Sequence, residues 1–315
     1  MIKNNHNVIT FFKNTYKVIT YYKGNYKVFT SSQKIYNVIT KLSLYYIVIT
    51  FSFPVWALSF DSDLTEGTLI FGHLNPDETL FVQESYLNIG KDSKNLFQIQ
   101  ADKNNRFVFG IPQDAKEITL TLKKGNTEKE KIFSVQKRTW DEDHVTGLPS
   151  AKVTPNTQNQ KRITTESLEM RQARQHSYFS DFPEKWTLPV PQYTRISSHF
   201  GSRRILNNVK KQGHSGTDLA APIGTPVLSP VAGKVVYIHP DMFLTGKTIL
   251  IDHGFGVFSS YSHLNTINVK LNQTVKSGDL IGTVGQTGRA TGPHLHFTVT
   301  WYGVRVNPED LIKFK

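Results

Sequence analysis

The pattern of apolar and polar positions from residue 186 onward is that of an all-β domain. Runs such as TPVLSPVAGKVVYI, KTILIDH, FGVFSSYSHL and LHFTVTWYG alternate apolar with polar residues, and Gly or Pro clusters separate them. A period of two places the apolar side chains on one face of a strand. Only NPEDLIK, near the end of the sequence, predicts a helix there.

Residues 58–137 show the same alternation and predict a separate small β domain. Strand-like runs, among them ETLFVQES, RFVFGIP and EITLTLKK, recur every ten to fifteen residues between polar turns such as NPDE and KKGN. This spacing favours an immunoglobulin-like β-sandwich. The segment carries no catalytic motif, so it is interpreted as a positioning or gating module or as an inert spacer.

Residues 138–185 are polar and predict a linker. It opens with the Pro-marked stretch GLPSAKVTPNTQNQ, and KRITTESLEMRQARQ predicts a helix. The apolar residues Ile163, Leu168 and Met170 make a poor stripe, so this helix is expected either to lie against a domain surface or to extend freely. The fold class is therefore all-β, with a short helical linker between two β domains.

The first forty residues carry a ten-residue repeat in which NVIT, KVIT, KVFT and NVIT end successive decads, with Tyr16, Tyr26 and Tyr36 in register. A β-arranged repeat is one interpretation, because an even period keeps each residue on one strand face. The other interpretation is a translated upstream DNA repeat, with the true start of the protein near Leu42 or Leu44. We prefer this second interpretation, in which the repeat is an artefact.

Residues 41–57 have the layout of a secretory signal peptide. Lys41 supplies the positive charge, LSLYYIVITFSFP the apolar region, and Val55 and Ala57 fit the small-residue cleavage rule. The competing interpretation is a membrane anchor, but the stretch 42–60 is short for a span and is interrupted by Pro54. We therefore expect export to the periplasm or cell envelope, with membrane contact only through an uncleaved signal segment.

Charge and cysteine content narrow the function further. The formal net charge is +12, and residues 1–57 hold seven lysines and no acid, which leaves +5 for the rest. This modest excess of positive charge would favour binding to an anionic cell wall, and ordinary solubility is the alternative interpretation. No basic patch with interleaved aromatic residues supports nucleic-acid binding. The chain has no cysteine, which excludes a thiolate metal site.

Three short motifs carry the candidate chemistry. In GRATGPHLHF, His294 and His296 lie two apart and so project from one face of a strand. In GHSGTDLAAP, His214 and Asp218 lie four apart, and the flanking Gly and Pro residues favour a loop that runs into a strand. YSHL supplies His263. Three ligands drawn from histidine and carboxylate, with a fourth position left to water, are typical of catalytic zinc.

The order, spacing and context of these motifs resemble the lysostaphin-type, LytM-like zinc endopeptidases over residues 186–313. The resemblance implies a LytM-like catalytic domain of β-sheet or hybrid-barrel type at 186–315. It also implies one Zn²⁺ on His214, Asp218 and His296, with His263 and His294 acting on water and substrate. Since the chain has no HExxH motif, no glutamate base is available. Our assignment is His294 as general base and His263 facing the developing negative charge.

The same family opens its domain with a segment like ISSHFGSR, which puts Arg203 either near the cleft or in a solvated turn. The loop GTVGQTGRATG is expected near the cleft, and it is not a phosphate cradle because no helix follows it. His253, in ILIDHGFG, is interpreted as a hairpin-turn residue, and support of a metal ligand is the alternative.

The resemblance implies an exported endopeptidase whose partners are peptidoglycan stem peptides. The expected bond joins D-alanine to meso-diaminopimelate, and a glycine bridge is the alternative. A catalytically inactive LytM-like regulator of another hydrolase is the rival function. A lipoyl-type carrier, suggested by PVLSPVAGKVV and VKSGDLIG, ranks lower because a carrier has no use for aligned histidines.

Overall fold

The computed structural model describes residues 18–22, 25–29, 58–87 and 95–312, and the chain divides into two compact units, 1–56 and 57–315. In the first unit, β1 (Val18–Tyr22) and β2 (Asn25–Phe29) pair antiparallel. The rest of the ten-residue repeat and the expected signal peptide, 41–57, lie outside the described residues. Within the described part of the chain, no helix has the length and apolar character needed to cross a bilayer.

The strands within residues 58–137, the segment expected to form an accessory domain, make two antiparallel sheets. One holds β3 (Ser59–Phe60), β4 (Leu69–His73) and β7 (Arg106–Gly110). The other has the order β6 (Leu96–Ile99), β5 (Glu78–Gln83), β8 (Glu117–Lys124) and β9 (Thr127–Ser134), and a 3-10 turn, η1 (Glu84–Leu87), follows β5. Buried and half-buried residues alternate along β5, as the sequence pattern predicts. The immunoglobulin-like topology of this domain stays a prediction.

The linker packs against the catalytic domain. Strand β10 (Glu142–Val145) pairs parallel with β12 (Arg203–Leu206), and α3 (Ser150–Val153) and α4 (Thr157–Ala173) follow it. Helix α4 begins at the cap Asn156, whose side chain accepts a hydrogen bond from the Asn159 amide. Its Met170 is buried against the catalytic sheet, so the first of the two alternatives for this helix is correct.

The catalytic domain is built on one large sheet. Its strands along the chain are β11 (Arg195–Ser198), β14 (Thr217–Ala220), β15 (Pro226–Leu228), β16 (Gly233–Met242), β17 (Gly246–Asp252), β18 (Val257–Ile267), β19 (Thr274–Val275), β20 (Leu280–Val284), β21 (His294–Trp301) and β22 (Val304–Val306). A short β13 (Val209–Lys210) pairs with β12 outside this sheet. The expected helix at NPEDLIK is a single 3-10 turn, η2 (Pro308–Asp310), capped by Asn307.

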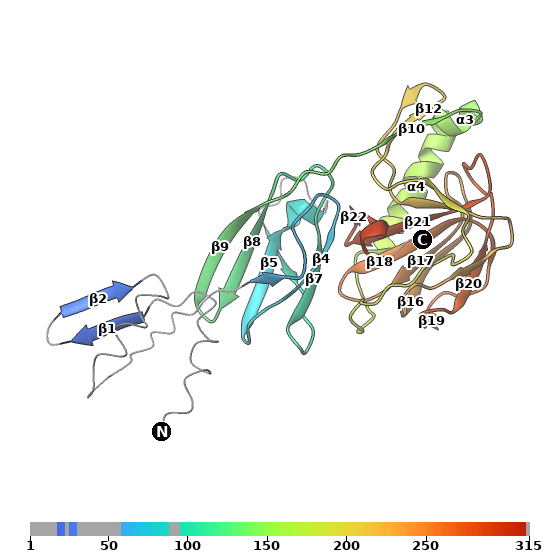
Figure 1. Ribbon diagram of the computed structural model, residues 1–315. Coiled ribbons are helices and arrows are strands. Elements are labelled where there is room, and N and C mark those ends of the chain that lie inside the picture. The colour runs from blue at the N-terminus through green and yellow to red at the C-terminus, as the bar shows by residue number, and fades with distance from the viewer. Residues whose placement is uncertain (1–17, 23–24, 30–57, 88–94, 313–315) are drawn as a thin grey trace. The chain divides into compact units, whose positions relative to one another are not determined.

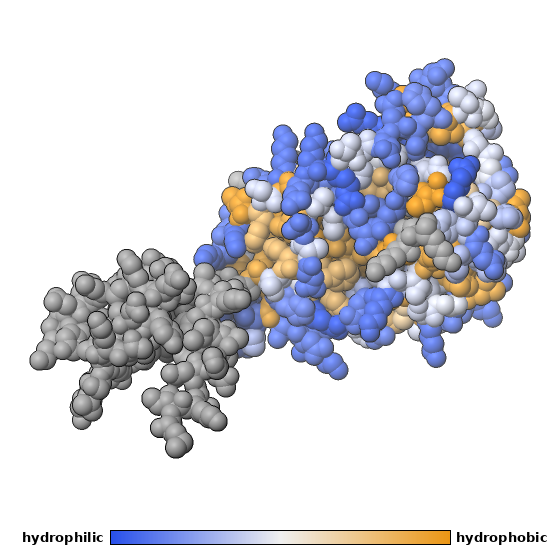
Figure 2. Space-filling model, in the orientation of Figure 1, coloured by the Kyte–Doolittle hydropathy of each residue, from blue (hydrophilic) through white to orange (hydrophobic). Residues whose placement is uncertain are grey.

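The strand order is β11-β14-β21-β18-β17-β16-β19, with β20 beside β18 and β22 beside β21. Helix α4 lies alongside this sheet (Figure 1). Its Met170 packs with Met242, Leu250 and Phe258. Figure 2 shows a mostly hydrophilic surface with smaller apolar patches, consistent with apolar residues of the strands turned inward. The all-β fold class of the sequence analysis is confirmed.

The accessory domain packs on the far end of β21. The Trp301 ring lies edge-on to Phe97 and Phe109, with ring centroids 6.2 and 6.3 Å apart. At Gly110 an added Cβ would lie 3.0 Å from the Trp301 Cβ, so the two backbones approach closely. The accessory domain therefore contributes directly to the packing of the strand that carries His294 and His296.

His253 opens the turn between β17 and β18, as the hairpin interpretation predicts, and it is fully buried. Its Nδ1 lies 2.8 Å from the Ala232 carbonyl oxygen and its Nε2 lies 2.6 Å from the Ser259 hydroxyl. Because Nδ1 must donate to the carbonyl, the neutral ring is left with a lone pair on Nε2. Burial lowers the pKa of His253 from 6.5 to about 4.

We expect His253 to make the folded state less stable in mild acid. The unfolded chain binds a proton near pH 6.5 and the folded chain only near pH 4, so stability is complete above pH 6.5 and falls as the pH decreases toward 4. The full difference is about 3 kcal/mol, of which about 2 kcal/mol is lost between pH 7 and pH 5. Urea unfolding of the wild type and His253→Gln at both pH values measures it, and an equally steep loss in the variant would contradict it.

Candidate metal centre

The residues of the expected ligand set meet where β14 pairs with β21. Asp218 lies directly opposite His296 in the antiparallel register, and opposed residues of a sheet project from the same face. His214 lies in the loop before β14, which agrees with the loop-into-strand geometry that the glycines favour. The strand register thus joins two motifs that are 78 residues apart in the sequence.

The ligand atoms are close enough to share one ion. Asp218 Oδ1 lies 2.7 Å from His296 Nδ1 and 3.1 Å from His214 Nε2, and those two nitrogens are 2.9 Å apart. All three residues offer an atom within 4.8 Å of the others. Two imidazole nitrogens and one carboxylate oxygen are a donor set that suits Zn²⁺ with an open fourth position. The residues present therefore fit the expected metal.

Burial and neighbouring charges put Asp218 and His296 in the protonation states that a metal requires. His214, Asp218 and His296 are only 2%, 6% and 9% exposed. Burial by itself raises the pKa of the Asp218 carboxyl, but His214 and then His296 outweigh it and hold that pKa well below its usual range. Burial lowers the pKa of His296 to about 4. An ionised carboxylate and a neutral imidazole are the forms that coordinate metal.

Arg204 holds the second carboxylate oxygen of Asp218. Its Nη2 lies 2.6 Å from Asp218 Oδ2 and 3.2 Å from the Ser198 hydroxyl, which also donates to Asp143 of β10. From the sequence, the neighbouring Arg203 was expected either near the cleft or in a solvated turn, and its exposure agrees with the second alternative. Arg203 is exposed, and Arg204 makes the contact because adjacent strand residues point to opposite faces.

The second nitrogens of the two histidine ligands are also held. His214 Nδ1 lies 2.7 Å from the Ser198 hydroxyl and 3.0 Å from the His199 carbonyl oxygen. His296 Nε2 lies 3.1 Å from the Thr298 hydroxyl and 3.2 Å from that of Ser215. Such contacts fix ring orientation, and none of these hydroxyl partners was identified from the sequence. Thr298 was the one the sequence could have suggested, since it lies two residues after His296 on the same strand face.

His263 and His294 border the ligand group without belonging to it. Their rings have centroids 4.7 Å apart, and His294 Nε2 lies 3.8 Å from Asp218 Oδ1. His263 Nδ1 donates to the Thr287 carbonyl at 2.7 Å, and His294 Nδ1 donates to the Gly292 carbonyl at 2.8 Å. Both carbonyls belong to the loop between β20 and β21, which places this loop at the site as the sequence predicts.

His263 sits in an unusual backbone conformation. Its φ is +63°, in the left-handed region that non-glycine residues rarely occupy, and its amide donates to the Thr245 carbonyl at 2.7 Å. Burial, and then the charges of His294 and His296, lower the pKa of His263 well below 6.5. The surrounding structure therefore holds a neutral imidazole beside the ligand group.

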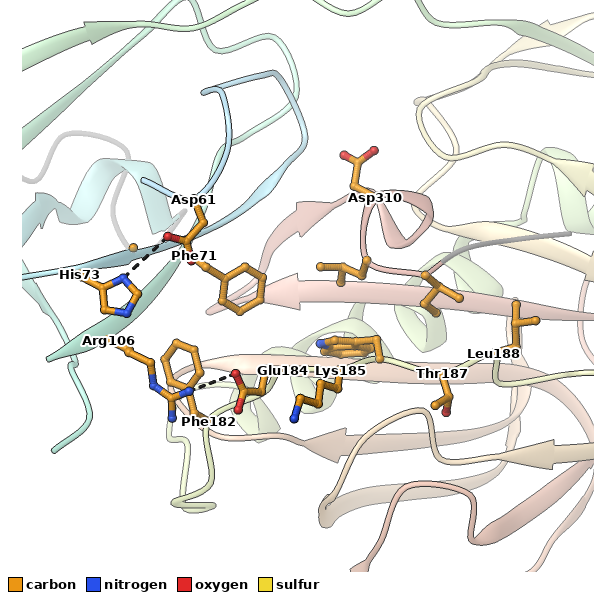
Figure 3. A pocket seen from close by; sticks show the side chains of 14 residues that line it. Asp61, Phe71, His73, Arg106, Phe182, Glu184, Lys185, Thr187, Leu188 and Asp310 are labelled. Atoms are coloured by element: carbon orange, nitrogen blue, oxygen red, sulfur yellow. Dashed lines mark hydrogen bonds and ion pairs between the residues drawn. The ribbon is translucent and has the colours of Figure 1, made fainter. Parts of the chain in front are cut away.

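One cavity bordered by described residues lies away from this group. It has a volume of about 830 Å³ and is bordered by residues of the accessory domain, the linker and the C-terminal turn. Figure 3 shows Phe71, Phe182 and two polar pairs, His73 with Asp61 and Arg106 with Glu184, around it. None of the three expected ligands lines this cavity. The carboxylates that line it are already paired, and among the described residues the group of potential metal ligands lies elsewhere, so we assign the chemistry to the polar group on β14 and β21.

Comparison with known proteins agrees with this geometry. Residues 212–308 match the description of peptidase family M23. A solved structure from Pseudomonas aeruginosa, assigned to peptidase M23, is 31% identical with a TM-score of 0.59, and the match covers 79% of this chain and 94% of that one. The peptidoglycan DD-endopeptidase ShyA of Vibrio cholerae is 44% identical over 122 residues, 38% of this chain and 28% of its own length.

A second curated relative is the DD-carboxypeptidase/endopeptidase Mpg of Neisseria meningitidis, 42% identical over 118 residues, 37% of this chain and 26% of that protein. The chain thus spans little more than a quarter of either curated relative, whereas it spans nearly all of the Pseudomonas chain. The matched residues include all three ligand residues and both neighbouring histidines, so the LytM-like resemblance is confirmed. By sequence, fold and site, the chain belongs to peptidase family M23.

Proposed function

We propose that this chain is a zinc-dependent endopeptidase that hydrolyses peptide cross-links of bacterial peptidoglycan. The observation that carries the proposal is the convergence of His214, Asp218 and His296 on one point beside two further histidines. A structural metal site would be closed by four protein ligands, whereas this group offers three. The remaining position suits a water molecule or a substrate oxygen.

The bond we propose joins D-alanine to meso-diaminopimelate of a neighbouring stem peptide. It is supported by the names of the Vibrio and Neisseria relatives, which are a DD-endopeptidase and a DD-carboxypeptidase/endopeptidase. The substrate lies outside the cytoplasm, so we also propose that the chain is exported to the periplasm or cell envelope. A glycine bridge has no comparable support.

In the proposed mechanism, His214, Asp218 and His296 would hold Zn²⁺, which would supply polarisation of the scissile carbonyl and activation of water as the nucleophile. His294 acts as the general base. Because its Nδ1 proton is held by the Gly292 carbonyl, the lone pair lies on Nε2, the atom that faces Asp218 and the ligand group. A neutral imidazole in this tautomer can accept the proton of the attacking water and return it to the leaving amine.

His263 is proposed to face the negative charge that develops on the scissile carbonyl. Its Nδ1 is held by the Thr287 carbonyl, so the neutral ring presents a lone pair on Nε2. It can therefore donate to an oxyanion only after Nε2 takes up a proton. The proposed general base His294 accepts a proton in this mechanism, and its ring centroid lies 4.7 Å from that of His263.

A catalytically inactive regulator is the rival function. Such a domain typically lacks one or more metal ligands, and here the three ligands are present and assembled. No observation on this structure favours the rival.

The direct test is mass spectrometry of muropeptides released from defined sacculi by the purified protein. We expect cleavage at the D-alanine to diaminopimelate bond, inhibition by a metal chelator and recovery on addition of zinc. Binding to sacculi without release of cleaved fragments would instead establish the regulator. Release of fragments that is unaffected by the chelator would contradict the metal mechanism.

Arg204 is predicted to tune the metal site by orienting Asp218. Replacing it with methionine, which keeps most of the side-chain volume, should weaken zinc affinity by about 10- to 100-fold. Arg203→Met is the matched control, because that neighbouring side chain is exposed and should leave affinity unchanged. Competition with a fluorescent zinc chelator measures both variants. Equal zinc affinity in Arg204→Met and the wild type would show that the contact with Asp218 has no influence on the metal.

A further inference from the structure

Arg289 is a half-buried cation in the loop between β20 and β21, close to the metal group. Its backbone amide donates to the Leu244 carbonyl at 2.8 Å. Two residues earlier in the same loop, the Thr287 carbonyl accepts the hydrogen bond from His263, and five residues later the chain reaches His294. The loop that orients one of these histidines and leads into the other therefore also carries this guanidinium.

The side chain of Arg289 reaches α3, where Val153 packs with Leu206 of β12, the strand that carries Arg204. Burial, and then the positive charge of Arg204, lowers the pKa of Arg289 below its ordinary value. Arg204 in turn contacts Asp218 Oδ2 at 2.6 Å. Two guanidinium groups thus lie near each other beside the expected zinc ligands. Such an arrangement is unfavourable unless negative charge compensates it.

Arg289 contacts a neutral backbone carbonyl, whereas the other two arginines near the site contact carboxylates. Arg204 pairs with Asp218, and Arg162 pairs with Glu166. Among the residues that the structure describes, Arg289 has no carboxylate partner. Its Nη1 donates to the backbone carbonyl of Lys152, 3.2 Å away. A guanidinium carries five N–H donors in a planar fork, so one bond to a neutral carbonyl leaves most of its capacity unused.

Lys152 adds a second cation on the same side, and the carboxylates of Asp241 and Glu166 lie near enough to influence it. Its ammonium group donates to the Phe243 carbonyl and lies 3.9 Å from the centroid of the Phe243 ring. Burial, and then the charge of Arg162, lowers the pKa of Lys152. Asp241 and Glu166 partly offset the charge of Lys152, so within the described residues Arg289 is the cation, on the rim formed by α3 and the Arg289 loop, whose natural complement is an anionic substrate group.

We propose that Arg289 recognises a carboxylate of the substrate next to the scissile bond. The inference rests on the proposed function. In a cross-link to meso-diaminopimelate, the carbon that bears the scissile nitrogen also bears a free carboxylate. We place this carboxylate against the Arg289 guanidinium, because the loop that carries Arg289 also supplies the carbonyls that hold His263 and His294 beside the expected zinc ligands. A bidentate pair would fix the orientation of the peptide as well as add binding energy.

The test compares two cross-linked muropeptide dimers that differ only in this carboxylate, free in one and amidated in the other. For the wild type we expect a kcat/KM about 10- to 100-fold higher on the free acid than on the amide. Arg289→Gln should lose this preference, with its activity lowered on the free acid and nearly unchanged on the amide. Arg289→Lys keeps the charge without the fork and should retain only part of the preference.

Arg171→Gln is the control, since Arg171 is an exposed arginine on α4 and should leave both rates unchanged. Zinc content and melting temperature of every variant show whether the loop is intact. If Arg289 merely ties its loop to Lys152, Arg289→Gln will slow both dimers equally, and this outcome overturns the proposal. A wild type that prefers neither dimer also overturns it but leaves the proposed function standing. A wild type that cleaves neither dimer overturns both.

Discussion

Replacing His294 with alanine is expected to lower kcat/KM on cross-linked muropeptides by about 10²- to 10⁴-fold, the range usual for loss of a general base. The metal content should stay at one zinc per chain, because His294 Nε2 lies 3.8 Å from Asp218 Oδ1 and His294 is not a member of the three-residue ligand group. Metal analysis of the purified variant, alongside single-substrate kinetics, measures both quantities.

The control for this variant is His176→Ala, which removes an exposed histidine that follows α4. It should match the wild type in both metal content and rate. Full activity in His294→Ala would remove the assignment of the general base. Loss of the metal from His294→Ala would instead make this residue a ligand, and the three-residue set would then have to be revised.

The second large effect is expected for the ligands themselves. His214→Ala and Asp218→Asn should lose both zinc and hydrolysis, since each leaves only two of the three donors. The loss of affinity should exceed the roughly 10- to 100-fold expected for residues that only support a ligand. The Asp218→Asn change preserves the size of the side chain, so it separates loss of the charged donor from loss of packing.

Thermal unfolding gives a readout that does not depend on turnover. A ligand that binds only the folded state stabilises it by about 2.7 kcal/mol when its free concentration is 100 times its Kd. Zinc should therefore raise the melting temperature of the wild type and of His294→Ala, and should leave that of His214→Ala unchanged. An equal rise in all three proteins would place the metal elsewhere.

The local features of the site could be predicted from the sequence because they depend on short-range geometry. His294 and His296 share a strand face since side chains alternate with a period of two, and that face is the one that meets Asp218. The glycines around His214 indicated a loop that leads into a strand. The identity of the partners across strands required the resemblance to a known family, because register between segments 78 residues apart is not encoded locally.

The supporting residues were harder to predict, and Arg203 shows why. The sequence left Arg203 open between the cleft and a solvated turn, because which of two adjacent arginines points inward depends on the register of β12, a strand of only four residues. The linker illustrates a second difficulty. Its helix has a weak apolar stripe, and its docking depends on a few specific contacts, such as the Glu166 carboxylate accepting from the Phe243 amide.

His253 shows a third difficulty. The sequence correctly indicated a turn after the strand TILID, but turns are usually exposed, and nothing in the local pattern predicted that this imidazole would be fully buried. The burial follows from tertiary neighbours, including Trp186 from the segment that enters the catalytic domain, whose ring centroid lies 5.1 Å away.

The position of Trp301 at the end of β21 limits how the protein can be divided for study or engineering. A fragment that begins near residue 186 would leave this large indole without Phe97 and Phe109 and would expose an apolar surface prone to self-association. A soluble minimal enzyme would therefore need a polar replacement at Trp301. Removing the N-terminal part of the chain would thus also require new packing beneath the strand that carries His294 and His296.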